Sequence, residues 1–492
     1  MKLAELLKDV RVVNLYLSGD PDITGIVYSS RQVEPGNIFV AIKGQRLDGH
    51  DFLGEALERG AAVVVSERPR PPELGITWVQ VLEAREALAL LAVNFYRQPS
   101  SELKVIGVTG TKGKTTITYI LEEILKTAGY RPGVIGTVDY RWPGHQFSAE
   151  RTTPEAPDIQ RILRQMVEDG VTHCLMEISS HSLQLKRVWG IGFDVAIFTN
   201  LSGEHLDYHQ TMENYFEAKK KLFFLNHKRQ ASIVNIDDPW GEKLLNELPM
   251  HTISFGFKPE AVVRAENFTI THEGMTATVS SPLGRLTFTS SLIGRHNLYN
   301  FLAAISAALV LSVPVPDIVR GISAIKNVPG RFENVPNSLG IKVIVDYAHT
   351  DASLENLLQA VRSLNPKKII LVFGCGGDRD RLKRPRMGEV AARLADWSII
   401  TSDNPRSEDP EKIIEEIEQG FHRAGYNNYE KIVDRRRAIE AALVMARKGD
   451  WVVIAGKGHE SYQVFKDRTV PFSDVETARE IMDSLKKKLE KK

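Results

Sequence analysis

The stretch Val105–Thr116, which reads VIGVTGTKGKTT, decides how the middle of the chain folds. It opens with apolar residues typical of a buried parallel strand, and it continues through Gly110 and Gly113. After Thr116, apolar residues recur at helical spacing. The pattern therefore predicts a strand, a glycine-rich loop and a helix, an arrangement whose backbone N–H groups and helix N-terminus bind phosphate.

The triplet Gly113-Lys114-Thr115 indicates that this loop binds a nucleotide and Mg²⁺. Lys114 would reach the β- and γ-phosphates of a nucleotide, and the Thr115 hydroxyl would bind Mg²⁺. The strict phosphate-loop pattern has a glycine where this chain has Val108, so the match is a variant form. The structural alternative is an ordinary glycine-rich turn between a strand and a helix.

Composition indicates a folded, soluble protein of about three domains. The chain has 492 residues, of which 42% are hydrophobic and 25% charged, with 63 basic against 62 acidic residues. This balance gives no overall basic field for nucleic acid or an anionic membrane. Cys174 and Cys375 suggest no disulfide framework and fit a reducing cytoplasm. We expect a cytoplasmic monomer with small-molecule substrates and neither nucleic acid nor membrane as a partner.

The order of strand and helix signals predicts an α/β protein with three domains. We place the boundaries at 1–99, 100–332 and 333–492, with a central P-loop ATPase built on a parallel sheet. The last domain is expected to be a Rossmann-like, doubly wound sheet, with strands at Ile341–Val345, Ile369–Phe373, Ser398–Thr401 and Val452–Ala455. Polar loops follow all four strands, and ligands bind at the carboxyl ends of strands in such sheets.

Acidic and histidine side chains follow two expected strands of the central domain. Glu177 would hold Mg²⁺ directly or through water, or it is a carboxylate in a surface turn. The spacing of His205 and His209 suggests a zinc site, but no third-ligand pattern accompanies them. A hard cation beside phosphates therefore fits better. Both histidines being structural is the alternative. Arg331 would clamp a nucleotide phosphate or form an interdomain salt bridge, and the residues alone do not distinguish these two roles.

An ordered set of motifs carries a family resemblance. These are GTKGKTT, MEISSH, TNLSGEHLDYH, Lys219, GRHNLYN, PGRFE, DYAHT, GCGGDRD, DNPRSEDP and GKGHE. Together, across nearly the whole chain, they resemble the Mur ligase family, ATP-dependent amino-acid ligases of peptidoglycan precursor synthesis. The resemblance implies that ATP phosphorylates a peptide carboxylate and that the amine of an incoming amino acid attacks the acyl phosphate.

The resemblance also implies the ATP and metal residues. The phosphate loop would comprise Gly110, Thr111, Lys112, Gly113, Lys114, Thr115 and Thr116, with Lys112 where some members carry Asn. Asn297, Arg331 and Asp346 would line the adenine and ribose side of the ATP site. Thr115, Glu177, His205 and Lys219 would hold Mg²⁺, with Lys219 converted to a carbamate, or N6-carboxylysine; an unmodified surface lysine is the alternative. Catalysis would fall to Lys114, Lys219, His205 and His349.

Two further ligand sets follow from the same resemblance. A UDP-N-acetylmuramoyl-L-alanyl-D-glutamate substrate would contact Tyr28, Ser30, Gln45, Arg46, Leu47, Thr152, Thr153, Ser179, Leu185 and Arg187, with Leu185 where some relatives use Gln. Meso-diaminopimelate would contact Arg379, Asp403, Asn404, Pro405, Arg406, Gly456 and Glu460. Arg406 can grip the distal carboxylate of diaminopimelate through two parallel N–H bonds, whereas lysine would leave it unpaired.

Three other functions compete with this interpretation. The first is the same ligase using L-lysine, and the second is a folylpolyglutamate synthetase, which lacks the DNPR loop and this first domain. The third is a P-loop ATPase or kinase acting as a switch, which has no evident use for the charged loops of the last domain.

Overall fold

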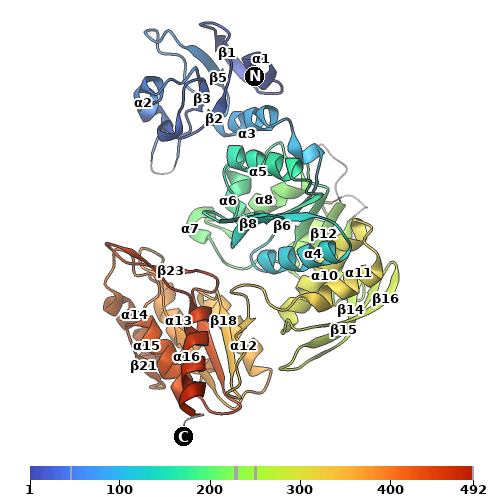
Figure 1. Cartoon of the computed structure of the whole chain (residues 1–492), viewed down its shortest axis with the longest axis vertical. Coiled ribbons are helices and arrows are strands. Elements are labelled where there is room, and N and C mark those ends of the chain that lie inside the picture. Colours follow the sequence, from blue (N-terminus) through green and yellow to red (C-terminus); the bar gives the residue numbers. More distant parts are fainter. Residues whose placement is uncertain (45–46, 226–230, 249–251, 490–492) are drawn as a thin grey trace. The chain divides into compact units, whose positions relative to one another are not determined.

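The computed structural model describes residues 1–44, 47–225, 231–248 and 252–489 (Figure 1). The chain folds into two compact units, each described by itself below. Unit 1 comprises Met1–Asn267, Thr278–Thr287 and Leu298–Ile322, and unit 2 comprises Phe268–Ala277, Phe288–Asn297 and Ser323–Lys492. The domain boundaries expected from the sequence stay a prediction. No helix among the described residues is long and apolar enough to cross a membrane.

The first sheet of unit 1 has five strands in the order β1–β5–β4–β3–β2. All neighbours pair in parallel except β1 and β5. Its strands are β1 (Val12–Tyr16), β2 (Gly25–Val27), β3 (Asn37–Val40), β4 (Val63–Ser66) and β5 (Thr77–Val81). The α-helices along this part of the chain are α1 (Leu3–Leu6), α2 (Leu53–Glu58) and α3 (Ala84–Phe95). Short 3₁₀ turns are η1 (Ser30–Gln32), η2 (Gly49–Phe52) and η3 (Pro99–Ser101).

The second sheet has eleven strands in the order β16–β15–β14–β13–β12–β11–β6–β10–β7–β8–β9. Its strands are β6 (Lys104–Thr109), β7 (Pro132–Ile135), β8 (Asp139–Trp142), β9 (His145–Ser148), β10 (His173–Glu177), β11 (Val195–Phe198), β12 (Ala231–Asn235), β13 (Ile253–Gly256), β14 (Val263–Ile270), β15 (Met275–Ser281) and β16 (Gly284–Ser290). The strands from β14 through β11, β6 and β10 to β7 pair in parallel. Every residue of β10 is buried, as expected for a strand covered on both faces.

Helices follow the strands of this sheet as parallel crossovers require. They are α4 (Lys114–Thr127), α5 (Ala156–Glu168), α6 (Ser180–Gln184), α7 (Leu206–His209), α8 (Met212–Lys220), η4 (Lys221–Phe223), α9 (Pro239–Leu245), α10 (Arg295–Val310) and α11 (Val315–Ala324). The division between units passes through β14, β15, β16 and α10. The apolar periodicity after Thr116 becomes the buried face of α4, where Ile120, Leu121 and Ile124 are fully enclosed.

The sheet of unit 2 has six strands in the order β17–β18–β22–β19–β20–β21, and all pairs are parallel except β17 with β18. Its strands are β17 (Glu333–Asn334), β18 (Lys342–Asp346), β19 (Ile369–Phe373), β20 (Trp397–Ile400), β21 (Tyr429–Lys431) and β22 (Trp451–Ala455). The strands β23 (Tyr462–Val464) and β24 (Thr469–Pro471) form a separate two-stranded antiparallel sheet. The four strands predicted for this domain are thus confirmed as β18, β19, β20 and β22.

Both faces of this sheet are covered, because successive side chains of a strand point to opposite faces. Leu371 and Phe373 of β19 pack in one cluster with residues of α12 (Asp351–Arg362), α13 (Lys383–Leu394) and α14 (Pro410–Ala424). Ile370 and Val372 pack in another cluster with residues of α15 (Arg435–Met445) and α16 (Asp474–Leu489).

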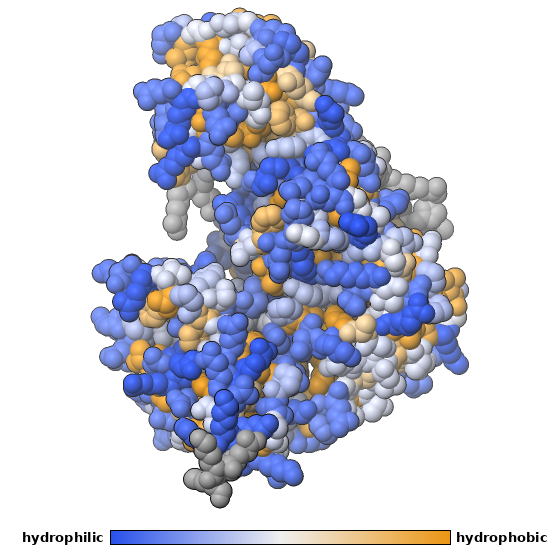
Figure 2. Space-filling view, in the orientation of Figure 1, coloured by the Kyte–Doolittle hydropathy of each residue, from blue (hydrophilic) through white to orange (hydrophobic). Residues whose placement is uncertain are grey.

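The outward face of α16 in Figure 2 is mainly hydrophilic, while Ala478, Ile481 and Met482 of the same helix are buried. Unit 2 is therefore a doubly wound α/β sheet. The predicted α/β class with a central P-loop domain and a Rossmann-like last domain is confirmed.

Candidate active site

The phosphate loop connects β6 to α4 and needs both of its glycines. Gly110 has φ +140°, and a Cβ there would lie 1.9 Å from Thr199 Oγ1. Gly113 has φ +92°, and a Cβ there would lie 2.5 Å from Asn300 Oδ1. A residue with a Cβ atom would therefore clash at either position. The turn ends at the N-terminus of α4, where the helix dipole favours an anion.

The outer part of the loop is anchored to the segment after β11. Asn200 accepts hydrogen bonds from the Thr111 N–H at its carbonyl oxygen (2.9 Å) and from the Lys112 N–H at Oδ1 (3.0 Å). Thr199 Oγ1 donates to the Lys112 carbonyl oxygen at 2.6 Å. These two N–H groups therefore serve the fold, and anion binding falls to the start of α4 and to Lys114. Thr199 and Asn200 begin the quoted motif TNLSGEHLDYH, but no role was predicted for either residue.

Glu177 is the last residue of β10, and its carboxylate is surrounded by hydroxyl and amide donors. Thr115 Oγ1 donates to Oε2 at 2.9 Å, and Thr137 donates its N–H to Oε1 and its hydroxyl to Oε2, both at 2.9 Å. The residue is 1% exposed, so the surface-turn alternative is wrong. Thr115 and Glu177, predicted from separate motifs, lie together, whereas Thr137 was missed because it carries no motif of its own.

Lys219 lies on α8 and points into the protein against the phosphate loop. Its Nζ donates to the Gly110 carbonyl oxygen at 2.7 Å and lies 4.5 Å from the Tyr215 ring centroid. The residue is 1% exposed, which excludes the surface-lysine alternative. Burial lowers the pKa of Lys219 well below its usual value, the charge of Lys114 lowers it further, and Glu204 raises it. Lys114 Nζ donates to the same Gly110 oxygen at 2.9 Å, so two lysine side chains converge on one carbonyl.

His205 precedes α7 in a left-handed conformation, with φ +58°. Burial lowers its pKa, Lys114 and Lys219 lower it further, and Glu204 opposes them. His181 lies with its ring centroid 4.9 Å from that of His205, and burial lowers its pKa to about 4. At neutral pH these imidazoles are therefore uncharged.

The donor set around the loop suits a hard cation. The Thr115 hydroxyl and the Glu177 carboxylate lie within 2.9 Å of each other, and Mg²⁺ prefers oxygen ligands of this kind. No cluster of three or more His, Cys, Asp or Glu side chains in the described ranges is arranged to hold a metal ion.

Several residues predicted for the peptide substrate gather beside Glu177. Thr153 Oγ1 donates to the Glu177 carbonyl oxygen at 2.8 Å and accepts from the Ser179 N–H at 3.1 Å. Arg187 Nη1 donates to the Thr153 carbonyl oxygen at 3.0 Å, and the Thr152 hydroxyl lies 3.1 Å from that of Thr137. Arg187 Nε is buried and has no hydrogen-bond partner among the described residues.

The remaining residues of that set lie elsewhere or have other partners. Tyr28 donates to Asp158 on α5 at 3.2 Å, and Ser30 donates to Glu55 at 2.7 Å. Leu47 is exposed, and Leu185 follows the last turn of α6. Gln45 and Arg46 lie outside the described residues.

In unit 2, Asp346 ends β18 and orders the turn that contains Arg331. Its two carboxylate oxygens accept the N–H groups of Phe332 (2.7 Å) and Ala348 (2.8 Å). The Arg331 guanidinium lies 5.0 Å from the Tyr347 ring centroid.

Two more predicted residues of unit 2 are held by backbone carbonyls. His349 Nδ1 lies 2.9 Å from the Tyr347 carbonyl oxygen. Asn297, at the start of α10, donates to the Ile293 carbonyl oxygen at 2.8 Å.

The loops after β19, β20 and β22 meet around Asn404. Asn404 Nδ2 donates to Glu460 Oε2 at 2.8 Å, and the Asn404 carbonyl oxygen accepts the Gly377 N–H at 2.9 Å. Arg406 has φ +52°, and its Nη1 donates to the Gly377 carbonyl oxygen at 2.7 Å. Gly456 packs against Asp403, because a Cβ there would lie 2.7 Å from Asp403 Oδ2. Asp403, Asn404, Arg406, Gly456 and Glu460 therefore form one group, which brings together three of the four polar loops predicted from the sequence.

Arg379 and Pro405 flank the same group. The side chain of Arg379 comes within 3.9 Å of a Cβ built at Gly376, and the Pro405 carbonyl oxygen lies 1.9 Å from one built at Gly377. The loop after β19 therefore packs directly on the DNPR segment.

A fully buried arginine braces these loops and was missed. Arg384 of α13 forms ion pairs with Glu408 and Glu416, each at 2.8 Å. Arg384 also donates to the Gly376 carbonyl oxygen at 3.3 Å. Burial raises the pKa of Cys375 in this loop to about 12, so the thiol is a poor nucleophile at neutral pH.

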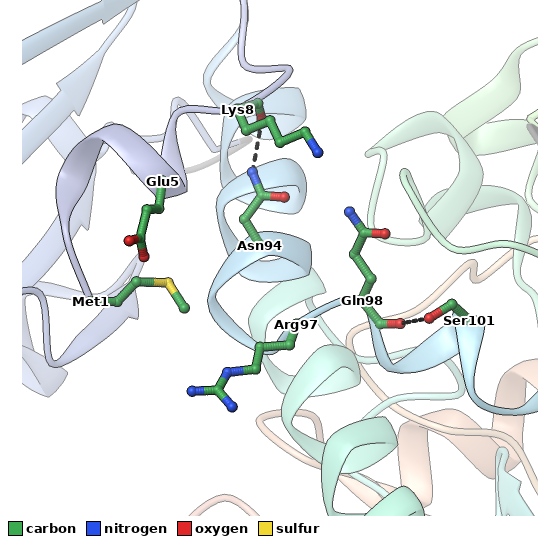
Figure 3. A pocket seen from close by; sticks show the side chains of 7 residues that line it. All are labelled: Met1, Glu5, Lys8, Asn94, Arg97, Gln98 and Ser101. Carbon is green, nitrogen blue, oxygen red and sulfur yellow. Dashed lines mark hydrogen bonds between the residues drawn. The ribbon is translucent and has the colours of Figure 1, made fainter.

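A pocket of about 300 Å³ lies between α1 and the end of α3 (Figure 3). Asn94 donates to the carbonyl oxygens of Leu6 and Lys8 there, and Ser101 donates to that of Gln98. Its lining contains none of the predicted site residues, and these polar groups serve the local backbone.

Comparison with known proteins identifies the family of the chain. Three sequence-family models match successive stretches: "Mur ligase family, catalytic domain" at residues 22–96, "Mur ligase middle domain" at 108–308 and "Mur ligase, glutamate ligase domain" at 330–458.

Full-length relatives agree with these models. The chain is 44% identical over 485 residues to the UDP-N-acetylmuramoyl-L-alanyl-D-glutamate–2,6-diaminopimelate ligase of Alkaliphilus metalliredigens, covering 98% of this chain and 97% of that protein. It is 45% identical over 484 residues to the enzyme of the same name from Gloeobacter violaceus, covering 98% of each. A solved structure of a ligase with this name matches with a TM-score of 0.71 at 31% identity and 99% coverage of both chains. The chain belongs to the Mur ligase family.

Proposed function

We propose that this protein is the ATP-dependent ligase that adds meso-2,6-diaminopimelate to UDP-N-acetylmuramoyl-L-alanyl-D-glutamate in peptidoglycan precursor synthesis. The names of its full-length relatives support this reaction. The observation that carries the proposal is the convergence of Lys219 and Lys114 on the Gly110 carbonyl oxygen beside the Thr115–Glu177 pair. We also propose domains at 1–99, 100–332 and 333–492, in line with the three matched stretches.

The chemistry begins with an unreactive carboxylate, which must be converted into an acyl phosphate. Transfer of the γ-phosphoryl group to that carboxylate brings two anions together, so positive charge and N–H donors must offset the repulsion. Lys114 and the N-terminus of α4 supply these groups in unit 1. Mg²⁺, held by Thr115, Glu177, His205 and the carbamate of Lys219, would neutralise phosphate charge.

A lysine must be neutral to react with carbon dioxide, and the environment of Lys219 favours that form. The product carbamate is an anion, which the adjacent Lys114 would stabilise. We infer that Lys219 acts as N6-carboxylysine, and its depressed pKa and buried contact with Gly110 support this role.

The amino-acid substrate would bind in unit 2. Arg406 would pair with the distal carboxylate of diaminopimelate, and Glu460 would accept an N–H of its distal ammonium. The proximal amine then attacks the acyl phosphate, the C–N bond forms, and phosphate leaves. Lysine lacks the distal carboxylate and would leave Arg406 without its partner, which costs on the order of a few kcal/mol.

The deciding experiment supplies ATP, Mg²⁺ and the UDP-muramoyl dipeptide with meso-diaminopimelate or L-lysine in parallel tubes. Mass spectrometry should detect a tripeptide product, with ADP and phosphate, only in the diaminopimelate tube. A lysine product would retain the family but overturn the assignment of Arg406. ATP hydrolysis without a peptide product in either tube would favour the ATPase-switch alternative.

A further inference from the structure

Lys457 is a buried lysine among the loops assigned above to the amino acid. It follows β22, is 0% exposed, and donates from Nζ to Asn404 Oδ1 at 3.1 Å and to Glu460 Oε2 at 3.0 Å. It thereby joins the loop after β22 to the loop after β20, although β19 lies between these strands in the sheet.

The contact with Lys457 sets the orientation of the Asn404 side-chain amide. Asn404 Oδ1 accepts from Lys457 Nζ and also from the Val464 N–H at 3.0 Å. Both partners are donors, so only the oxygen of the amide can face them. Nδ2 is therefore turned toward Glu460, where one of its two hydrogens is used.

The same contact fixes the Glu460 carboxylate. Oε2 accepts from both Lys457 and Asn404, whereas Oε1 accepts no hydrogen bond from any residue in the described part of the chain. The Glu460 side chain is 18% exposed. Oε1 is therefore the oxygen that remains for a cation of the ligand.

The backbone around Lys457 leaves it little freedom to move away. Gly456 has φ +117° and packs on Asp403, while Gly458 has φ +54° and a Cβ there would lie 2.8 Å from Tyr347 Cβ. Both flanking positions therefore require glycine, and the lysine stem enters the site from a fixed point.

We propose that Lys457 is a positioning residue for amino-acid recognition. It presents the Asn404 Nδ2 and Glu460 Oε1 atoms in the orientation that binds the distal end of diaminopimelate, without touching the substrate itself. This inference rests on the proposed function, because it assumes that Asn404 and Glu460 contact that substrate.

The test is a double-mutant cycle in the full-length enzyme, made from Lys457→Met, Glu460→Gln and the double variant. Lys457→Met should raise the KM for diaminopimelate about tenfold or more, with the KM for ATP unchanged, as expected for a residue that orients a ligand-binding group. In the Glu460→Gln background the same change should have little further effect, because the group that Lys457 orients has already been altered. Lys466→Met, which alters an exposed lysine nearby, is the matched control and should behave as wild type.

The outcomes separate this inference from the proposed function. An unchanged KM for diaminopimelate, an equal rise in the KM for ATP, or fully additive effects in the cycle would each overturn the role of Lys457. Failure of the wild-type enzyme to form the diaminopimelate product would overturn the proposed function instead. Thermal unfolding checks that each variant folds, and Lys457→Gln replaces the Met variant in the same cycle if the latter does not fold.

Discussion

Two buried lysines, Lys219 in unit 1 and Lys457 in unit 2, have opposite surroundings. Both are at most 1% exposed. Lys457 lies 3.0 Å from the Glu460 carboxylate, whereas the hydrogen bond of Lys219 goes to a backbone carbonyl, with the like charge of Lys114 nearby. Burial alone therefore does not define the role of a lysine. Lys457 has a carboxylate partner and joins two loops, whereas burial and the nearby charge of Lys114 favour the neutral, reactive amine of Lys219.

The largest expected effect separates these two roles directly. Lys219→Met should lower kcat by about a thousandfold, because it removes the group proposed to hold Mg²⁺ at the phosphates. Lys457→Met should act mainly on the KM for diaminopimelate. Lys220→Met is the matched control, since the next lysine pairs with Glu217 and Glu247 at the surface. A nearly normal kcat for Lys219→Met would contradict the proposed difference in role between Lys219 and Lys457.

The next prediction tests whether unit 2 binds diaminopimelate through the charge of Arg406. Arg406→Ala should raise the KM for diaminopimelate about a hundredfold, since the distal carboxylate loses a two-bond partner. The KM for ATP should stay the same in this variant, and steady-state kinetics with each substrate varied measures both. Arg406→Lys should restore the activity only in part, because an ammonium lacks the planar fork of donors. Equal KM values for all three enzymes would contradict the assignment.

A smaller effect is expected at the carboxylate of Glu177, which accepts the Thr137 hydroxyl. Thr137→Val removes one of the hydroxyl donors to Glu177 but keeps the backbone N–H bond. The Mg²⁺ concentration needed for half-maximal activity should rise about tenfold, as is common when a residue that orients a metal ligand is lost. Thr137→Ser keeps the hydroxyl and should match wild type, and an unchanged Mg²⁺ requirement in the Val variant would exclude Thr137 from this role.

The smallest effect concerns stability and follows from the depressed pKa of Lys219. Between the folded-state pKa and the ordinary value of 10.5, the unfolded chain binds more protons, so this lysine makes stability rise with pH. In carbon-dioxide-free buffer without Mg²⁺, Lys219→Met should therefore melt at a higher temperature than wild type at neutral pH. The difference should shrink as the pH approaches 10.5. Calorimetry at several pH values measures it, and a constant difference would contradict the pKa shift.

The sequence predicted the elements that depend on local pattern. The strand, glycine loop and helix around Gly113 follow from apolar periodicity and from the need for left-handed backbone. The four polar loops of unit 2 follow from strand order in a doubly wound sheet. What the sequence could not supply was the pairing of distant groups, such as Lys219 with the Gly110 carbonyl 109 residues away.

The same limit explains the residues that were missed. Thr137 and Arg384 carry no motif and gain their roles only from the carboxylates that tertiary packing places beside them. Lys457 lies within a quoted motif, GKGHE, but its partner Asn404 is 53 residues away.

The hydrogen bonds of Asn200 connect two parts of the candidate active site. They tie the phosphate loop to the segment that leads, within a few residues, to Glu204 and His205. Asn200 therefore holds the phosphate loop and the start of the histidine segment together, so a displacement of either one would strain these hydrogen bonds.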